Sequence, residues 1–127
     1  QVGACWHGWV GKSDAIARER YEPRYRAYHA FNMAMIKSVN DNPPAYLIST
    51  FDYDFLSTQG PAIVGGPERF AERLTYLSEL VGADLNLIKM DMGGVPREEY
   101  VEMVELLGSE VIPSLNVRSP AAVAANA

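Results

Sequence analysis

Two stretches of the chain repeat one pattern, in which a short apolar run is followed by a Gly-Gly pair and then by an amphipathic segment that begins at or near a proline. The runs are Ala62–Val64 and Leu85–Met92, the glycine pairs are Gly65-Gly66 and Gly93-Gly94, and the expected helices are Pro67–Val81 and Pro96–Val111. Proline is favoured at the first turn of a helix, and a short apolar run is typical of a strand buried on both faces. The repeat distance of about 30 residues is that of parallel βα units. The pattern therefore predicts an α/β fold.

A third unit of the same kind precedes these two. Val2–Val10 reads as a strand, and a helix is expected from about Ser13 to Ile36, with Pro23 bending or interrupting it. The breaker Asn40–Pro44 then opens a long loop or insertion at about 41–60. Residues 1–115 are expected to form one unit, followed by a flexible tail over 116–127.

Composition excludes several classes of function. The net charge of −5 and the pI near 4.9 argue against a nucleic-acid partner, because phosphate binding needs clustered Lys and Arg. The sequence has no apolar run of 18 residues, so no membrane span is expected. Because Cys5 is the only cysteine, it cannot form an intrachain disulfide, which favours a reducing compartment and a cytoplasmic location. The chain also opens directly into a strand without a methionine, which suggests a remnant of a longer protein.

Alternation along the strands assigns side chains to two faces. The helix-covered face is expected to carry Val2, Ala4, Trp6 and Val10 of the first strand and Ile88, Met90 and Met92 of the last. The opposite face is expected to carry Cys5, His7 and Trp9 together with Leu87, Lys89 and Asp91. Polar residues on the inner face, near the carboxyl ends of parallel strands, are where barrel enzymes place their chemistry. Two alternatives stay open: His7 as a structural histidine, and Lys89 with Asp91 as an ion pair that only fills the barrel mouth.

Four segments, in this order and spacing, carry a resemblance to a known family. They are Val2–Ala17, Ala62–Leu74, Ile88–Glu99 and Val111–Leu115. Together they are similar to the C-terminal third of the bacterial luciferase-like monooxygenases, over about residues 2–115. The resemblance implies a partial (β/α)8 TIM barrel made of its last three βα units, which would be the sixth to eighth strands. It also implies reduced FMN as the cofactor, or the deazaflavin F420 in one branch.

The resemblance carries over to individual residues only in part. His7 matches an active-site histidine of the alkanesulfonate monooxygenase branch, which makes it the candidate catalytic acid or base. Cys5 stands where that branch has an arginine, which argues against a sulfonate substrate. The candidate cofactor-binding residues are Cys5, Trp9, Gly65 and Gly66, the last two through amides at a helix start. Four residues are candidates for the substrate site or barrel mouth: Lys89, Asp91, Tyr53 and Phe55. No metal ligand is predicted.

The sequence is compatible with three functions. The first is part of a flavin-dependent monooxygenase that uses reduced FMN and O2 to oxidise a small organic substrate. The second is an F420-dependent oxidoreductase of the same family, and the third is a non-catalytic, self-associating half-barrel. Three strands cannot close a barrel, so we expect exposed strand edges and an exposed inner face that includes Trp9, Leu87 and Ile63 or Val64. Such a chain is expected to form homo-oligomers or to need an N-terminal barrel portion, and to be inactive alone.

Overall fold

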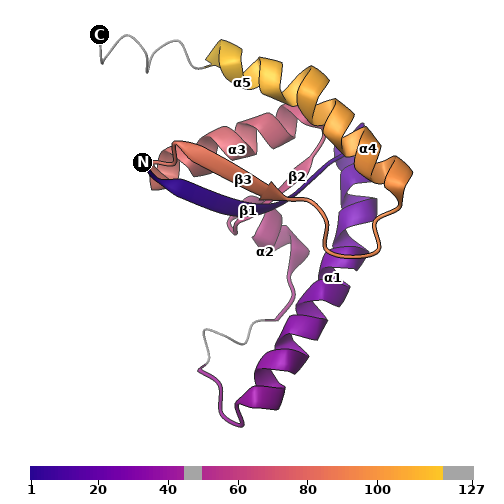
Figure 1. The fold of residues 1–127 in the computed structure, drawn as a ribbon, viewed down its shortest axis with the longest axis vertical. Coiled ribbons are helices and arrows are strands. Elements are labelled where there is room, and N and C mark those ends of the chain that lie inside the picture. Colours follow the sequence, from indigo (N-terminus) through magenta and orange to yellow (C-terminus); the bar gives the residue numbers. More distant parts are fainter. Residues whose placement is uncertain (45–49, 119–127) are drawn as a thin grey trace.

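A computed structural model describes residues 1–44 and 50–118, and Figure 1 shows the order of its elements. The strands are β1 (Gly3–Val10), β2 (Ala62–Gly65) and β3 (Leu85–Lys89). The helices are α1 (Asp14–Val39), α2 (Tyr53–Thr58), α3 (Pro67–Val81), α4 (Arg97–Leu106) and α5 (Ile112–Arg118), with a π-helical turn, η2 (Leu107–Val111), between the last two. The chain is thus a mixed α/β protein, as its repeated pattern predicts.

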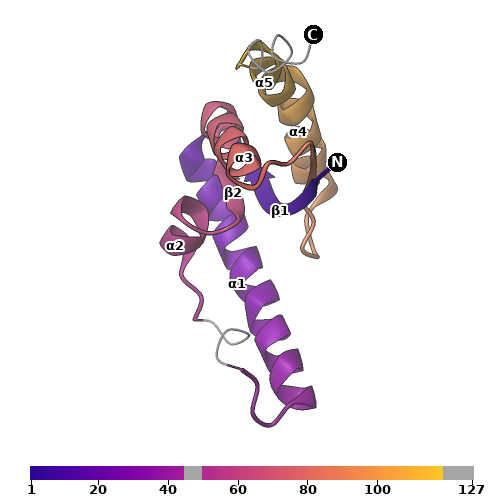
Figure 2. The ribbon, with the colours of Figure 1, turned by 90° about the vertical axis from the view of Figure 1, so that its left-hand side faces the viewer.

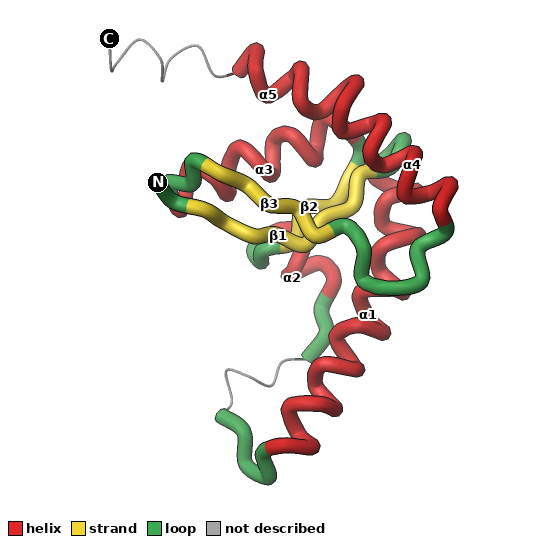
Figure 3. Tube along the Cα trace, in the orientation of Figure 1, coloured by secondary structure: helices red, strands yellow, loops and turns green. Residues whose placement is uncertain are grey.

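The three strands, yellow in Figure 3, are parallel. Their pairing gives the order β2-β1-β3. His7 pairs with Ala62 on one side and with Lys89 on the other, so the middle of β1 faces the start of β2 and the end of β3. Consecutive strands of a barrel are neighbours, whereas here β1 separates β2 from β3, as in open doubly wound sheets. The described residues show a small parallel sheet, and its closure into a barrel stays a proposal.

Helices cover both faces of this sheet. The N-terminal half of α1, which connects β1 to β2, lies over the face that carries His7 and Trp9. The other connection, α3, lies over the opposite face, where a Cβ at Gly8 would come within 3.2 Å of the Phe70 ring and 2.7 Å of Ile88 Cγ2. A side chain at position 8 would therefore push α3 and β3 outward. In the order β2-β1-β3 the two connections run in opposite directions across the sheet. Because both are right-handed, their helices lie on opposite faces.

The core lies between the sheet and these helices. Its fully buried large side chains are Trp9, Val10, Tyr21, Ile63, Phe70, Met103 and Val111. Burial of each such apolar side chain stabilises the fold by roughly 1.5–3 kcal/mol. The core therefore draws on two strands, β1 and β2, and on the helices α1, α3 and α4 with the η2 turn.

The predicted boundaries hold in some elements and fail in others. Helix α3 spans Pro67–Val81 as predicted, and Gly82 ends it in the left-handed conformation at φ 65°. Helix α1 continues through Pro23 without interruption and ends at Val39, beyond the expected Ile36. Two ion pairs between residues four apart support the helix here: Arg18–Glu22 lies just before the proline and Glu22–Arg26 spans it.

The last strand and the C-terminal region also differ from expectation. β3 ends at Lys89 instead of Met92, because Asp91 Oδ1 accepts a hydrogen bond from the Gly93 amide (2.8 Å) in a turn. Gly93 and Gly94 follow with φ of 96° and 72°, which a strand cannot contain. Residues 116–118, expected in the tail, belong to α5. The expected insertion contains α2, while residues 45–49 and 119–127 lie outside the described part.

Candidate functional site

His7 is the half-buried centre of the predicted site. Its ring meets the Tyr25 ring edge-on, with 5.2 Å between centroids, and lies 5.6 Å from the Tyr28 ring. Burial, and then the nearby charge of Lys89, lower the pKa of His7 below its usual value. Its Nδ1 atom is buried and has no hydrogen-bond partner among the described residues. At neutral pH His7 is therefore an uncharged imidazole with one ring nitrogen free to accept or donate.

The prediction that His7 and Trp9 face away from the helices is wrong. Three tyrosines of α1, Tyr21, Tyr25 and Tyr28, lie against this face, because α1 crosses over it from β1 to β2. Their spacing of four and three residues places them on one side of a helix, and this was the sequence signal that could have revealed the contact.

Burial of Trp9 follows from the same packing. The Trp9 ring has no exposed surface, and the Arg24 guanidinium lies 5.0 Å from its centroid. The expected exposure of Trp9, Ile63 and Val64 on an open face is therefore wrong, since all three are buried. Trp9 contributes to the core and presents no surface to a cofactor in this conformation.

Lys89 stands beside His7 on β3 and contacts Tyr28. Its Nζ atom donates to the Tyr28 hydroxyl (3.1 Å) and lies 4.4 Å from the centre of that ring. Within the described ranges no carboxylate lies at ion-pair distance from Lys89. The alternative in which Lys89 pairs with Asp91 is therefore wrong, because the Asp91 carboxylate accepts from the Gly93 amide in its own turn. Because the Tyr28 oxygen accepts from Lys89, its own O–H can donate to a third group.

The rest of this face is open. Cys5 and Leu87 are register partners on β1 and β3, on the same face as His7 and Lys89, and both are exposed. Leu87 is 56% exposed, and Leu85 stands two residues earlier on the same face of β3. The site thus combines a neutral imidazole, an ammonium group and a phenol at one end with an exposed apolar platform at the other. Exposure of Leu87 confirms that part of the predicted open face.

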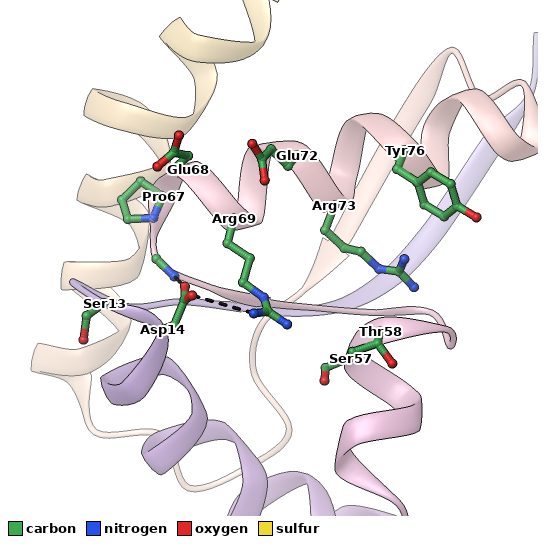
Figure 4. Close-up of a pocket in the computed structure, with 11 residues that line it drawn as sticks. Ser13, Asp14, Ser57, Thr58, Pro67, Glu68, Arg69, Glu72, Arg73 and Tyr76 are labelled. Carbon is green, nitrogen blue, oxygen red and sulfur yellow. Dashed lines mark hydrogen bonds and ion pairs between the residues drawn. The ribbon is translucent and has the colours of Figure 1, made fainter.

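The glycine turn after β2 lies at the carboxyl edge of the sheet, and its amide is already engaged. The Gly66 N–H donates to Asp14 Oδ1 (2.7 Å), and Arg69 Nη1 lies 3.7 Å from the other oxygen of that carboxylate (Figure 4). A Cβ at Gly65 would lie 2.9 Å from both the Arg69 side chain and the Asp14 carboxylate. The carboxylate of Asp14 therefore occupies the anion position at the start of α3.

A groove of about 830 Å³ lies beside this turn, between α1, α2 and α3 (Figure 4). Its lining carries Ser13, Asp14, Ser57, Thr58, Gly66, Pro67, Glu68, Arg69, Glu72, Arg73 and Tyr76. Three carboxylates and two guanidinium groups share this lining, so it has no strong excess of either charge. The Nη2 atom of Arg73 is bound to the Gly60 carbonyl. The groove is thus polar and largely self-paired, and His7 lies outside it.

Tyr53 and Phe55, the candidates from the insertion, both belong to α2. The centroid of the Tyr53 ring lies 6.3 Å from that of the Tyr21 ring, and the Arg18 guanidinium lies over the Tyr53 ring, 4.4 Å from its centroid. Burial raises the pKa of the Tyr53 hydroxyl. Phe55 is exposed, and its amide donates to Asp52 in the cap of α2. Tyr53 therefore contacts the Tyr21 ring of α1. Neither Tyr53 nor Phe55 contacts His7 in the structure.

Searches for related proteins identify no family. No protein-family model matches this chain, and no curated protein matches it significantly. Among the described residues, no group of three His, Cys, Asp or Glu side chains is arranged to hold a metal ion. Within the same residues, none of the helices has both the length and the apolar character of a membrane span. The similarity to luciferase-like monooxygenases thus stays a hypothesis from sequence.

Proposed function

We propose that this chain provides the His7–Lys89 face of a flavin- or deazaflavin-dependent oxidoreductase of the luciferase-like kind. One observation carries the proposal: His7 and Lys89 are register partners on neighbouring parallel strands, on a face that continues into the exposed Cys5 and Leu87. Barrel enzymes place acid–base groups on the strand faces near such carboxyl ends. A neutral base beside a fixed cation is the combination that proton transfer near a developing negative charge needs.

The exposed face fits the ring system of a flavin better than its phosphate. Leu87 and Cys5 offer an apolar surface against which a planar ring can lie, and Lys89 and His7 offer polar contacts at its edge. In contrast, the Gly66 amide already donates to Asp14, so a phosphate there would meet a carboxylate. The residues of this chain would therefore hold the ring, and the proposal assigns no phosphate contact to Gly65 or Gly66.

Each polar group has a distinct task in this proposal. A bound flavin would supply oxidation with O2, or a bound deazaflavin hydride transfer. His7, kept uncharged by burial and by Lys89, would accept a proton from the substrate. Lys89 would stabilise negative charge on a substrate or ring oxygen, and the O–H of Tyr28 would donate to the same oxygen. The substrate would be a small organic molecule, and the exposed thiol of Cys5 suits a reducing compartment such as the cytoplasm.

The barrel belongs to this proposal as its architectural part. The outer edges of β2 and β3 pair with no strand among the described residues, and unpaired edges favour the addition of further strands. The register pair of His7 and Lys89 requires β3 to stay beside β1, so a barrel that keeps this site would add its further strands at the outer edges of β2 and β3.

Titration of FMN and of F420 with the protein, followed by cofactor fluorescence, tests the proposal. We expect binding without turnover, and at least fivefold weaker binding in Leu87→Asp and in Lys89→Met. Leu80→Asp is the matched control, because Leu80 is an exposed leucine of α3 on another surface. The proposed site would be contradicted if Leu87→Asp and Leu80→Asp weakened cofactor binding equally, or if the wild-type protein bound neither cofactor.

The exposure of Leu87 and Leu85 beside a free strand edge also favours a second function, that of a non-catalytic, self-associating module. In that case two copies would cover each other's open sheet faces without any cofactor. Light scattering separates the two functions. A dimer that Leu87→Asp dissociates, in a protein that binds neither FMN nor F420, supports the module, whereas cofactor binding by a monomer supports the oxidoreductase.

A further inference from the structure

The C-terminal half of α1 extends beyond the sheet. Figures 1 and 2 show it running away from the strands and from α4, and the two views agree. Three of its large apolar side chains are exposed: Phe31 to 66%, Met35 to 48% and Val39 to 81%. They are spaced four residues apart, so they follow one another along one side of the helix. We call this row of side chains the α1 stripe.

Charge is distributed unevenly along α1. Its first half, residues 14–26, contains seven charged residues, whereas residues 27–39 contain one, Lys37. A solvated helix normally carries charged side chains on its exposed face, as the first half of α1 does. An exposed helix that is apolar and almost uncharged is typical of a surface that another molecule covers.

Small residues adjoin the large ones of the stripe. Ala27, Ala30 and Ala34 are exposed on the same half of the helix. Close approach of two helices, at about 8–10 Å between axes, needs small residues facing large ones. In an antiparallel pair related by a two-fold axis, the alanines of each helix can receive Phe31 and Met35 of the other. The stripe is thus complementary to itself.

We propose that the α1 stripe is the docking surface for a second copy of this chain, in an antiparallel pair of α1 helices. Near absence of charge argues for this occupant, since a charged partner would find no complementary group except Lys37. An isolated helical segment of about a dozen residues is marginal in water, so pairing would also stabilise the projecting half.

The short length of the α1 stripe limits the affinity of this contact. Residues 27–39 span about 20 Å of helix, and a strip of that length buries on the order of several hundred Å² on each copy. This is below the ~800 Å² per partner of a standard stable interface. The dimer is therefore weak and dissociates on dilution, and it can form whether or not the His7 face binds a cofactor.

Sedimentation velocity over a range of protein concentrations tests the inference. The wild-type chain should shift from monomer to dimer with concentration, and Phe31→Glu and Met35→Glu should each raise the dissociation constant at least tenfold. Glutamate is a good helix former, so both variants should keep the helix, which circular dichroism checks. Leu80→Glu is the matched control, because Leu80 is also 66% exposed on a helix, and it should leave the dimer unchanged.

Ala34→Trp supplies a second variant that keeps the apolar character of the stripe. Its bulk should block the close approach of two helices and weaken the dimer as Phe31→Glu does. The inference is overturned if the wild-type protein is monomeric at every concentration, or if Leu87→Glu dissociates the dimer while Phe31→Glu does not. The latter result would assign the contact between copies to the sheet face. Cofactor titration of the Phe31→Glu variant reports separately on the proposed function.

Discussion

Asp14 joins the start of α1 to the start of α3, and its removal should weaken that junction. Its carboxylate accepts the Gly66 N–H at 2.7 Å and lies 3.7 Å from Arg69 Nη1. A hydrogen bond to a charged group contributes about 1.5–3 kcal/mol, and a negative charge at a helix N-terminus about 0.3–1 kcal/mol. The side chain of Asp14 is more than half exposed, so solvent screening reduces both contributions and leaves the ion pair with Arg69 little to add.

From these contributions we expect Asp14→Ala to lower the free energy of unfolding by about 2 kcal/mol, and Asp14→Asn, which keeps an acceptor oxygen, by about 1 kcal/mol. Urea unfolding followed by circular dichroism measures both. Asp54→Ala is the control, because Asp54 is also an acidic residue in the first turn of a helix and its ion pair with Arg18 is exposed. We expect it to lower the free energy of unfolding by less than about 0.5 kcal/mol. If Asp14→Ala costs no more than Asp54→Ala, Asp14 does not bind the Gly66 amide in solution.

Three further predictions follow from the same packing. Tyr21→Phe should raise the free energy of unfolding by about 1 kcal/mol in urea, because the buried hydroxyl of Tyr21 has no partner among the described residues; a loss of 1 kcal/mol or more would show that it has one. Leu87→Cys should form a disulfide with Cys5 under mild oxidation, because the two residues are partners on strands ~4.8 Å apart, and mass spectrometry would detect the bond. In the sequential order of a barrel, β2 would lie between them, the distance would be ~9.6 Å, and no bond would form. The pKa of His7 is lowered in the fold, so the free energy of unfolding should be highest above pH 6.5 and should fall as the pH drops below that value. Lys89→Met should raise the pKa of His7 in an NMR titration, but should not restore its usual value, because burial is the larger cause of the shift.

Local chemistry made several elements of the fold predictable from sequence. Pro67 at the start and Gly82 at the end of α3 fixed both boundaries, because each residue favours its position for a backbone reason. The Gly65-Gly66 pair marked the end of β2, and parallel pairing followed from strands that alternate with helices. Exposure of Leu87 followed from the same alternation along β3.

Long-range pairing was the part that local patterns did not determine. No local pattern in β3 determines whether it pairs with β1 or β2, and the resemblance favoured the sequential order of a barrel. With β3 beside β1, α1 and α3 take opposite faces, which is why His7 meets Tyr25 on a face expected to be free of helices.

The candidate site was predictable in its β-strand residues and not in its helical ones. Alternation placed His7 and Lys89 on one face, and the structure makes them register partners. Tyr28 was missed because its role depends on where α1 lies relative to the sheet. The engagement of Gly66 by Asp14 was missed for the same reason, since 52 residues separate the two in sequence.

Mapping of backbone amide shifts by NMR, on addition of FMN and of F420, tests the proposed function most directly. We expect one of them to shift the amides of Cys5, His7, Leu87 and Lys89. Little change is expected at Gly66 and Arg69, where Asp14 occupies the anion position. Shifts concentrated at Gly66 and Arg69, or no shifts at millimolar cofactor, would contradict the claim that the His7–Lys89 face binds the ring of a flavin or deazaflavin.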